Sequence, residues 1–225
     1  PPERALAEAA LPPSSDPSVV RVHARATATA PPDQVEIDFS VITEAKQADV
    51  AAEENAKKQK AVLDALKAQL GTGGRVETLG YGLTPKYVFP QNGVRRIVGY
   101  TASNTVHVTS GRLERAGSLI DAGIGAGANQ VQSLRFTLSE PETLRREALM
   151  RAAREARQKA ETLAAALGMK LVRILRVEED GASMPPPVPQ GQFMARAEAA
   201  VTTPVEAADV ELDAGITLTA EVATK

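Results

Sequence analysis

Three glycines within five residues are the first feature of this sequence that could do chemistry. Residues 123–127 read GIGAG, and glycine-rich loops bind phosphate groups in nucleotide-binding proteins. Such a loop leaves a strand and opens a helix, so that the helix N-terminus faces the phosphate. Here the glycines follow a helical pattern and precede an alternating one, which is the reverse order. We therefore predict a tight helix-to-strand corner, with Gly127 and Asn129 as structural turn residues.

Two histidines, His23 and His107, are the other candidates for metal binding or proton transfer. Both fall on the polar faces of predicted strands, where an exposed histidine is an ordinary finding. Two imidazoles without a cysteine or a carboxylate pattern make a poor metal site. The sequence also has no Walker loop, no Gly-x-Ser-x-Gly elbow and no His-Glu-x-x-His motif. We predict no catalytic residues, no metal and no cofactor, and a hydrolase or metal-dependent enzyme is the weakest of the alternatives.

Charge is unevenly distributed along a chain whose net charge is only −2, so nothing attracts it as a whole to nucleic acid. Residues 145–176 carry nine Lys or Arg against three Glu, and residues 178–221 carry nine acidic residues against one Arg. The ordinary interpretation of the basic segment is an exposed helix face with ion pairs four residues apart, such as Glu147 with Arg151. Opposed charges on one chain would also suit head-to-tail contact between copies. The predicted oligomer interface comprises Arg151, Arg154, Arg157, Asp209, Glu211 and Asp213.

These residues must be positioned by a long helix and by several strands. Residues 141–167 contain strong helix formers with no internal glycine or proline, and Gly168 follows where a left-handed C-terminal residue is wanted. Residues spaced by three and four form one stripe of this helix. They are Leu144, Ala148, Ala152, Ala156, Ala160, Leu163, Ala164 and Leu167.

The periodicity of the whole chain predicts an α+β fold, with antiparallel sheet elements covered by helices in the order β-β-α-β-β-α-β-α-β-β. The first two strands, near 20–28 and 35–41, look like a hairpin closed by the turn at 31–33. A second strand pair covers 75–89 and 97–109, with a turn at 90–93. Alternation breaks once near Ser133, which indicates a bulge.

Two segments are predicted to lie outside the packed core. Residues 1–17 form a flexible N-terminal arm, and residues 180–204 form a Pro-rich loop or arm. The chain opens on Pro1 without an initiator Met, which predicts that an export signal has been removed or is absent from this sequence. No run of apolar residues is long enough for a membrane-spanning helix.

Several separated motifs together resemble the SIMPL-domain family of bacterial periplasmic and cell-envelope proteins, which includes periplasmic immunogenic proteins. The resemblance covers residues 18–223, so that 18–225 are expected to form one SIMPL-like domain. The first strand departs from it, since it lacks a Gly-rich segment that we would look for there. The motifs that carry the resemblance are Pro32-Asp33, Pro85-Lys86-Tyr87, Gly99-Tyr100-Thr101-Ala102-Ser103, Leu119-Ile120-Asp121, Gly127-Ala128-Asn129 with Phe136, the helix ending at Gly168 with Ala-Arg-x-Lys-Ala-Glu-x-Leu-Ala, and the terminal strand.

The resemblance implies a periplasmic protein, often oligomeric, with no established reaction and with links to envelope or oxidative stress. Our first hypothesis is a non-enzymatic structural or interaction protein that self-assembles into a homo-oligomer, peripheral to the outer membrane. It has no nucleic-acid partner and no identified small-molecule substrate. The alternative is a small-molecule or peptide binding module that uses the polar strand faces near His23, His107 and Tyr100.

Overall fold

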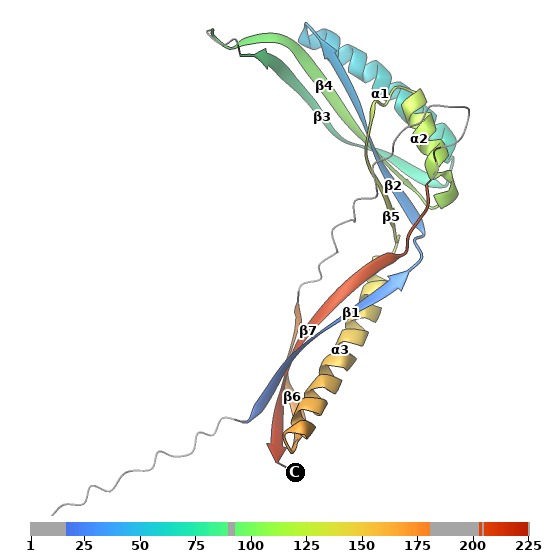
Figure 1. Cartoon of the computed structure of the whole chain (residues 1–225). Coiled ribbons are helices and arrows are strands. Elements are labelled where there is room, and N and C mark those ends of the chain that lie inside the picture. Colours follow the sequence, from blue (N-terminus) through green and yellow to red (C-terminus); the bar gives the residue numbers. More distant parts are fainter. Residues whose placement is uncertain (1–16, 90–92, 181–202, 204, 225) are drawn as a thin grey trace, which may run out of the picture. The chain divides into compact units, whose positions relative to one another are not determined.

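A computed structural model describes residues 17–89, 93–180, 203 and 205–224 (Figure 1). The predicted N-terminal arm at 1–17, the Pro-rich segment at 180–204 and the turn at 90–93 lie almost entirely outside these residues. The elements are β1 (Val19–Ala30), β2 (Gln34–Ala45), α1 (Ala48–Leu70), β3 (Gly74–Val88), β4 (Arg96–Ser110), the 3₁₀ turn η1 (Leu113–Arg115), α2 (Ala116–Gly125), β5 (Gln130–Thr137), α3 (Pro141–Ala166), β6 (Met169–Asp180) and β7 (Val210–Thr224). The fold is α+β, as the sequence predicts, and its strands form two sheets.

The chain divides into two compact units, each with its own sheet and its own helices. The α3 unit is built from β1, β6, β7 and most of α3. The α1/α2 unit contains β2 to β5 with α1 and α2. Each unit has a separate cluster of buried apolar residues.

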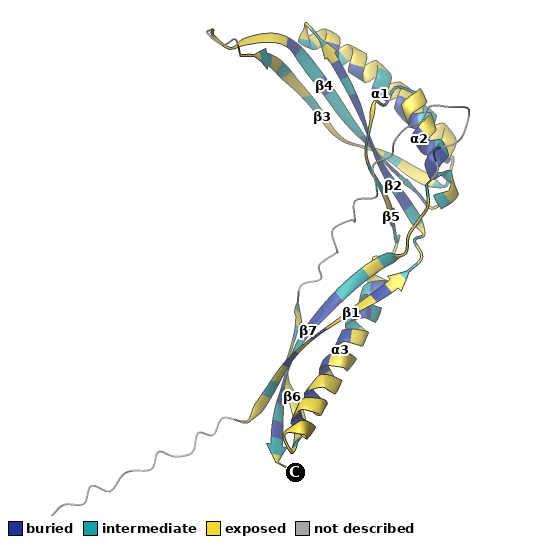
Figure 2. Ribbon diagram, viewed as in Figure 1, coloured by how far each residue is buried: buried dark blue, intermediate teal, exposed yellow. Residues whose placement is uncertain are grey.

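In the α3 unit, one helix lies along a three-stranded sheet of order β1-β7-β6. Alanines at every fourth position of α3 are buried against Val22 of β1 and Leu218 of β7. Figure 2 shows this row as dark segments along the helix. Because alanine is small, a row of buried alanines allows the helix to pack close to the sheet.

The predicted stripe is wrong at two residues, since Leu163 is 41% exposed and Leu167 is 74% exposed. The buried row repeats strictly every four residues, so it moves about 40° around the helix at each step. The side of α3 that faces the sheet therefore changes along the helix. Near the end of α3, this side lies about 90° around the helix axis from Leu163 and Leu167.

Gly168 ends α3 in the left-handed conformation, with φ +72°, which confirms the predicted C-terminal residue. A Cβ at this position would meet no other atom within 4 Å, so only the backbone conformation restricts the residue. We expect Gly168→Val to lower the free energy of unfolding by about 1–2 kcal/mol, because a β-branched residue is strained at positive φ. Urea unfolding measures the change. An equal loss in Leu167→Val, which alters an exposed neighbour, would contradict this reason.

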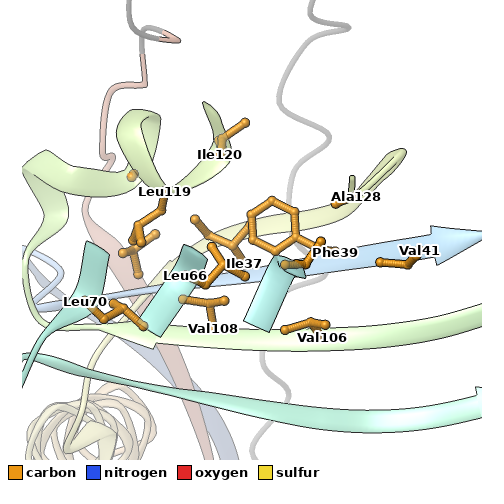
Figure 3. Packing of buried hydrophobic residues seen from close by; sticks show 13 residues of the cluster. Ile37, Phe39, Val41, Leu66, Leu70, Val106, Val108, Leu119, Ile120 and Ala128 are labelled. Atoms are coloured by element: carbon orange, nitrogen blue, oxygen red, sulfur yellow. The ribbon is translucent and has the colours of Figure 1, made fainter. Parts of the chain in front are cut away.

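In the α1/α2 unit, four antiparallel strands of order β3-β4-β2-β5 carry α1 and α2 on one face. Alternate residues of β2 and β4 point into the core, where Phe39 lies among Ile37, Leu66 and Leu119 (Figure 3). The predicted bulge is confirmed. Asp38 is opposite Ser133 while Phe39 is opposite Val131, so one extra residue of β5 lies between them.

The predicted hairpin between the first two strands is wrong. β1 pairs with β7 in one sheet, whereas β2 pairs with β4 and β5 in the other. The connection contains Pro31 and Pro32, whose rings hold φ near −65° and remove two N–H donors. Tight hairpin turns instead need positive φ, so this connection separates the two strands. The second predicted hairpin, β3 with β4, is confirmed.

Candidate functional site

The open face of the four-stranded sheet, opposite α1 and α2, carries a group of polar side chains near its centre. The strand register places Asp38 of β2 directly between His107 of β4 and Ser133 of β5. Side chains of directly paired residues lie on the same face and within reach of one another. We call these three residues, with Thr109 and Arg135, the Asp38 cluster.

Short contacts connect the Asp38 cluster. One carboxylate oxygen of Asp38 lies 2.6 Å from Nδ1 of His107, and the other accepts a hydrogen bond of 2.6 Å from the Ser133 hydroxyl. The hydroxyl of Thr109 lies 3.1 Å from Nε2 of His107, and Arg135 approaches Asp38 at 3.5 Å. The side chains of Asp38 and His107 are only 12% and 17% exposed. A hydrogen bond this sheltered from water is stronger than one on the surface.

The environment of Asp38 favours its ionised form. Burial by itself raises the pKa of the carboxyl group. Hydrogen bonds from Ser133 and His107, together with the positive charges of His107 and Arg135, outweigh burial and hold the pKa of Asp38 below its ordinary value. The cluster is therefore a carboxylate with its partners already in place.

The connection from Asp38 through His107 to Thr109 has the order of an acid–histidine–hydroxyl relay. Acyl transfer also needs donors for the developing oxyanion, usually backbone N–H groups beside the nucleophile. β4 is an interior strand, and Thr109 is paired with both β2 and β3, so its backbone groups lie within the sheet ladder. The arrangement is therefore better suited to binding a polar group than to acyl-transfer catalysis.

The lowered pKa of Asp38 makes part of the stability depend on pH. Its folded pKa is below the unfolded value of about 3.9, so the stabilisation is complete above that pH and is lost as pH falls through the folded pKa. Asp38→Asn should cost about 1.5–3 kcal/mol at neutral pH and much less at strongly acidic pH. Urea unfolding at both pH values measures this difference in free energy. The control is Glu54→Gln, at an exposed position of α1. Equal losses at the two pH values would contradict it.

His23, the other candidate, lies on the open face of the α3 unit. Its Nδ1 is 2.9 Å from a carboxylate oxygen of Asp180, and its side chain is 47% exposed. Each histidine thus has an aspartate of its own. Among the described residues there is no group of three or more His, Cys, Asp or Glu that could hold a metal ion.

Tyr100 does not belong with His107, although the binding-module alternative grouped them. The two residues are seven positions apart on β4, which is about 23 Å along a strand. An odd spacing also places their side chains on opposite faces of the sheet. Tyr100 pairs with Ala45 near the end of β2, away from the cluster.

The glycine-rich segment is the corner between α2 and β5, in the order that the sequence predicts. Gly127 has φ +119°. The Asn129 side chain accepts a hydrogen bond of 3.0 Å from the N–H of Ile42 and donates one of 2.7 Å to its carbonyl oxygen. The side-chain amide of Asn129 therefore continues the hydrogen bonding between β5 and β2. The glycine-rich corner has a structural role, as the sequence predicts.

The six charged residues of the predicted interface have different surroundings in the structure, although Arg151 and Asp213 both contact Thr27. Arg151 and Arg157 form ion pairs with Glu147 and Glu161 on α3 itself. Asp213 accepts a hydrogen bond from Thr27 of β1. The other three, Arg154, Asp209 and Glu211, are exposed. Their role between copies stays a prediction.

Sequence reasoning missed the Asp38 cluster, although it placed His107 on the polar face of a strand. The missing information was the register of β2 against β4, which no local pattern encodes. The sequence shows apolar residues at alternate positions in two strands, at Val106 and Val108 in one and at Ile37 and Phe39 in the other. Pairing those two strands with each other would have pointed to the contact.

None of the helices in the described part of the chain is long and apolar enough to cross a membrane.

Comparison with known proteins gives a consistent result. The profile of the family described as SIMPL, proteins of unknown function (DUF541), matches residues 20–220. The 26 kDa periplasmic immunogenic proteins of Brucella melitensis and Brucella abortus are each 30% identical over 216 residues, which is 93% of this chain and 86% of theirs. The uncharacterized protein YggE of Edwardsiella ictaluri is 30% identical over 146 residues, covering 65% of this chain and 61% of its own.

Proposed function

The chain belongs to the SIMPL family, and from that premise we propose that it is a non-enzymatic structural or interaction protein that self-assembles into a homo-oligomer. It is a periplasmic protein, in line with the two Brucella relatives. We further expect a link to envelope or oxidative stress and a peripheral location at the outer membrane.

The observation that carries self-assembly is the exposed apolar edge of the α3 unit. β6 lies at the edge of the described three-stranded sheet, so one row of its backbone N–H and C=O groups faces away from β7. Between residues 172 and 177 four apolar side chains are 42–54% exposed. They are Val172, Ile174, Leu175 and Val177. A long apolar edge strand of this kind is a template for pairing with another chain.

Two bulges in β6 determine how a second copy would meet it. The register against β7 shifts between Leu171 and Arg173 and again between Ile174 and Arg176. The extra residues are Val172 and Leu175, and they interrupt the ladder of backbone hydrogen bonds along β6. Contact through apolar side chains, with short stretches of backbone pairing, is therefore favoured over simple extension of the sheet. Exposed charges such as Arg154 and Glu211 would set the register of the copies rather than their affinity.

The mass of the protein in solution tests this proposal. Light scattering of the parent should give a multiple of the 23.7 kDa chain mass. The double variant Leu175→Lys with Val177→Lys should shift the mass toward 23.7 kDa, because charges on an edge strand oppose pairing. The control is Val50→Lys with Ile124→Lys, which places the same charges at comparably exposed positions on helices.

Two results would contradict self-assembly through β6. One is a parent that stays monomeric at high micromolar concentration. The other is a β6 variant that keeps the parent's mass while remaining folded by circular dichroism.

The Asp38 cluster supports the second candidate, a binding module for a small polar molecule or peptide. The sheltered Asp38–His107 pair, at 2.6 Å, offers a carboxylate and an imidazole on an open sheet face. A bound ligand raises the melting temperature of the folded state by mass action. A ligand-dependent shift in the parent that is absent in His107→Ala, with a monomeric mass, would favour this candidate over assembly.

A further inference from the structure

The β3–β4 hairpin continues beyond the other strands of its sheet. Pairing of β2 with β4 ends where Ala45 is opposite Tyr100, whereas β3 and β4 stay paired as far as Val88 and Arg96. Figure 1 shows this end of the hairpin extending past β2 and α1. We call residues 86–89 and 93–98 the hairpin tip. It is a two-stranded ribbon, which has no core in which to bury apolar side chains.

The hairpin tip nevertheless carries many large apolar side chains. Phe89 is 73% exposed and Val94 is 88% exposed, and three further residues of the tip are exposed by more than 40%. Tyr87 is opposite Ile97 on one face of the ribbon, while Val88 is opposite Arg96 on the other. Apolar side chains therefore occupy both faces, in contrast to the one-sided pattern of a strand that packs on a protein surface.

The charged residues of the hairpin tip itself are all basic. Between Glu77 and Glu114 the sequence contains no Asp or Glu, and its ionised side chains there are Lys86, Arg95, Arg96 and Arg112. Lys86 forms an ion pair of 2.7 Å with Glu44 of β2. The guanidinium of Arg95 lies over the ring of Tyr87, 3.6 Å from its centroid, and 6.0 Å from that of Phe89. The tip thus combines aromatic rings with arginines and has no acidic group.

We propose that the hairpin tip inserts into the headgroup region of a bilayer that contains anionic lipid. Aromatic rings and arginines are the side chains that anchor proteins at this depth, and basic residues are attracted to anionic headgroups. A bilayer interface surrounds an inserted ribbon, so it accommodates apolar side chains on both faces. A second copy of the chain would cover one face and leave the other exposed. The tip lies in the α1/α2 unit, so this inference does not depend on assembly through β6.

The absence of tryptophan from the sequence allows a site-specific test. A single tryptophan is introduced as Phe89→Trp at the tip, or as Leu79→Trp at an exposed site on the same hairpin, where Leu79 is 61% exposed. Vesicles of phosphatidylcholine alone and with phosphatidylglycerol are added. We expect the emission of the tip variant to shift to shorter wavelength with the anionic vesicles, and that of the control variant to stay unchanged.

A charge-matched pair of variants tests the role of the arginines. Arg95→Gln with Arg96→Gln should lower binding to the anionic vesicles at least about tenfold, on the scale expected for two basic residues near such a surface. Arg25→Gln with Arg146→Gln changes the net charge equally at exposed sites elsewhere and should change binding far less. The proposal is overturned if the Phe89→Trp emission does not shift, or if both pairs of arginine variants behave alike. It is also overturned if tip variants lower the oligomer mass of a protein that does not bind vesicles, since the tip would then contact another copy.

Discussion

Replacing Phe39 by alanine should lower the free energy of unfolding by about 3–5 kcal/mol, the range for truncating a fully buried aromatic residue. Phe39 is completely buried in the centre of the α1/α2 unit, between the sheet and α2 (Figure 3). With only seven aromatic residues in the chain, this ring fills space that the small aliphatic neighbours cannot reach. The truncation leaves a cavity that they close only in part.

Urea unfolding measures this loss, and Phe89→Ala is the matched control because Phe89 is 73% exposed at the hairpin tip. The control should change the free energy by less than about 0.5 kcal/mol, as surface substitutions usually do. Similar losses in the two variants would show that burial of Phe39 does not determine the stability of this core.

Gly123 provides an independent check on the position of the Phe39 ring. A Cβ on Gly123 would lie 2.7 Å from Cε1 of Phe39, which is too close for two carbon atoms. Gly123→Ala should therefore destabilise the parent, although alanine is preferred over glycine inside a helix by about 1 kcal/mol. In the Phe39→Ala background the clash is gone and the same substitution should stabilise. A double-mutant cycle with no coupling would contradict the packing of α2 on Phe39.

Replacing Ala156 by aspartate should cost about 4 kcal/mol or more, because it places an unpaired charge in an apolar contact. Ala156 is completely buried between α3 and the sheet of its unit, with Ala152 and Ala160 one turn away on either side. A carboxylate at this position would be removed from water, since Ala156 is completely buried. The variant should lose the native structure of the α3 unit at much lower urea concentration than the parent.

Ala153→Asp is the control for this prediction, since Ala153 lies on the exposed face of the same helix. It has the same change in charge and helix propensity but no burial. Hydrogen exchange of the β7 amides, measured in both variants, should be faster in Ala156→Asp alone. A comparable effect in Ala153→Asp would mean that the alanine row is not the buried face.

Sequence periodicity was sufficient to predict the elements and their faces, because both are determined by neighbouring residues. The alternation of Ile37 and Phe39 with polar residues, the alanine row of α3 and the ending at Gly168 are local patterns of this kind. The predicted burial of Leu163 and Leu167 is wrong because the buried side of a long helix shifts gradually around its axis.

Strand partners could not be predicted in the same way, since pairing joins residues that are distant in the sequence. β1 and β2 follow each other but belong to different sheets, and β7 reaches β1 from the opposite end of the chain. The Asp38 cluster was missed for this reason, because it depends on the register of three strands. The hairpin tip was visible as a strand pair, but its exposure depends on where β2 stops.

Hydrogen exchange along β6 tests the central claim, assembly through this edge, most directly. Light scattering identifies one concentration at which copies are associated and one at which they are separate, and exchange is then followed at both. We predict that amides between Val172 and Val177 exchange more slowly in the associated sample, while those of α1 keep their rates. A change in mass without slower exchange in β6 would contradict assembly through this strand.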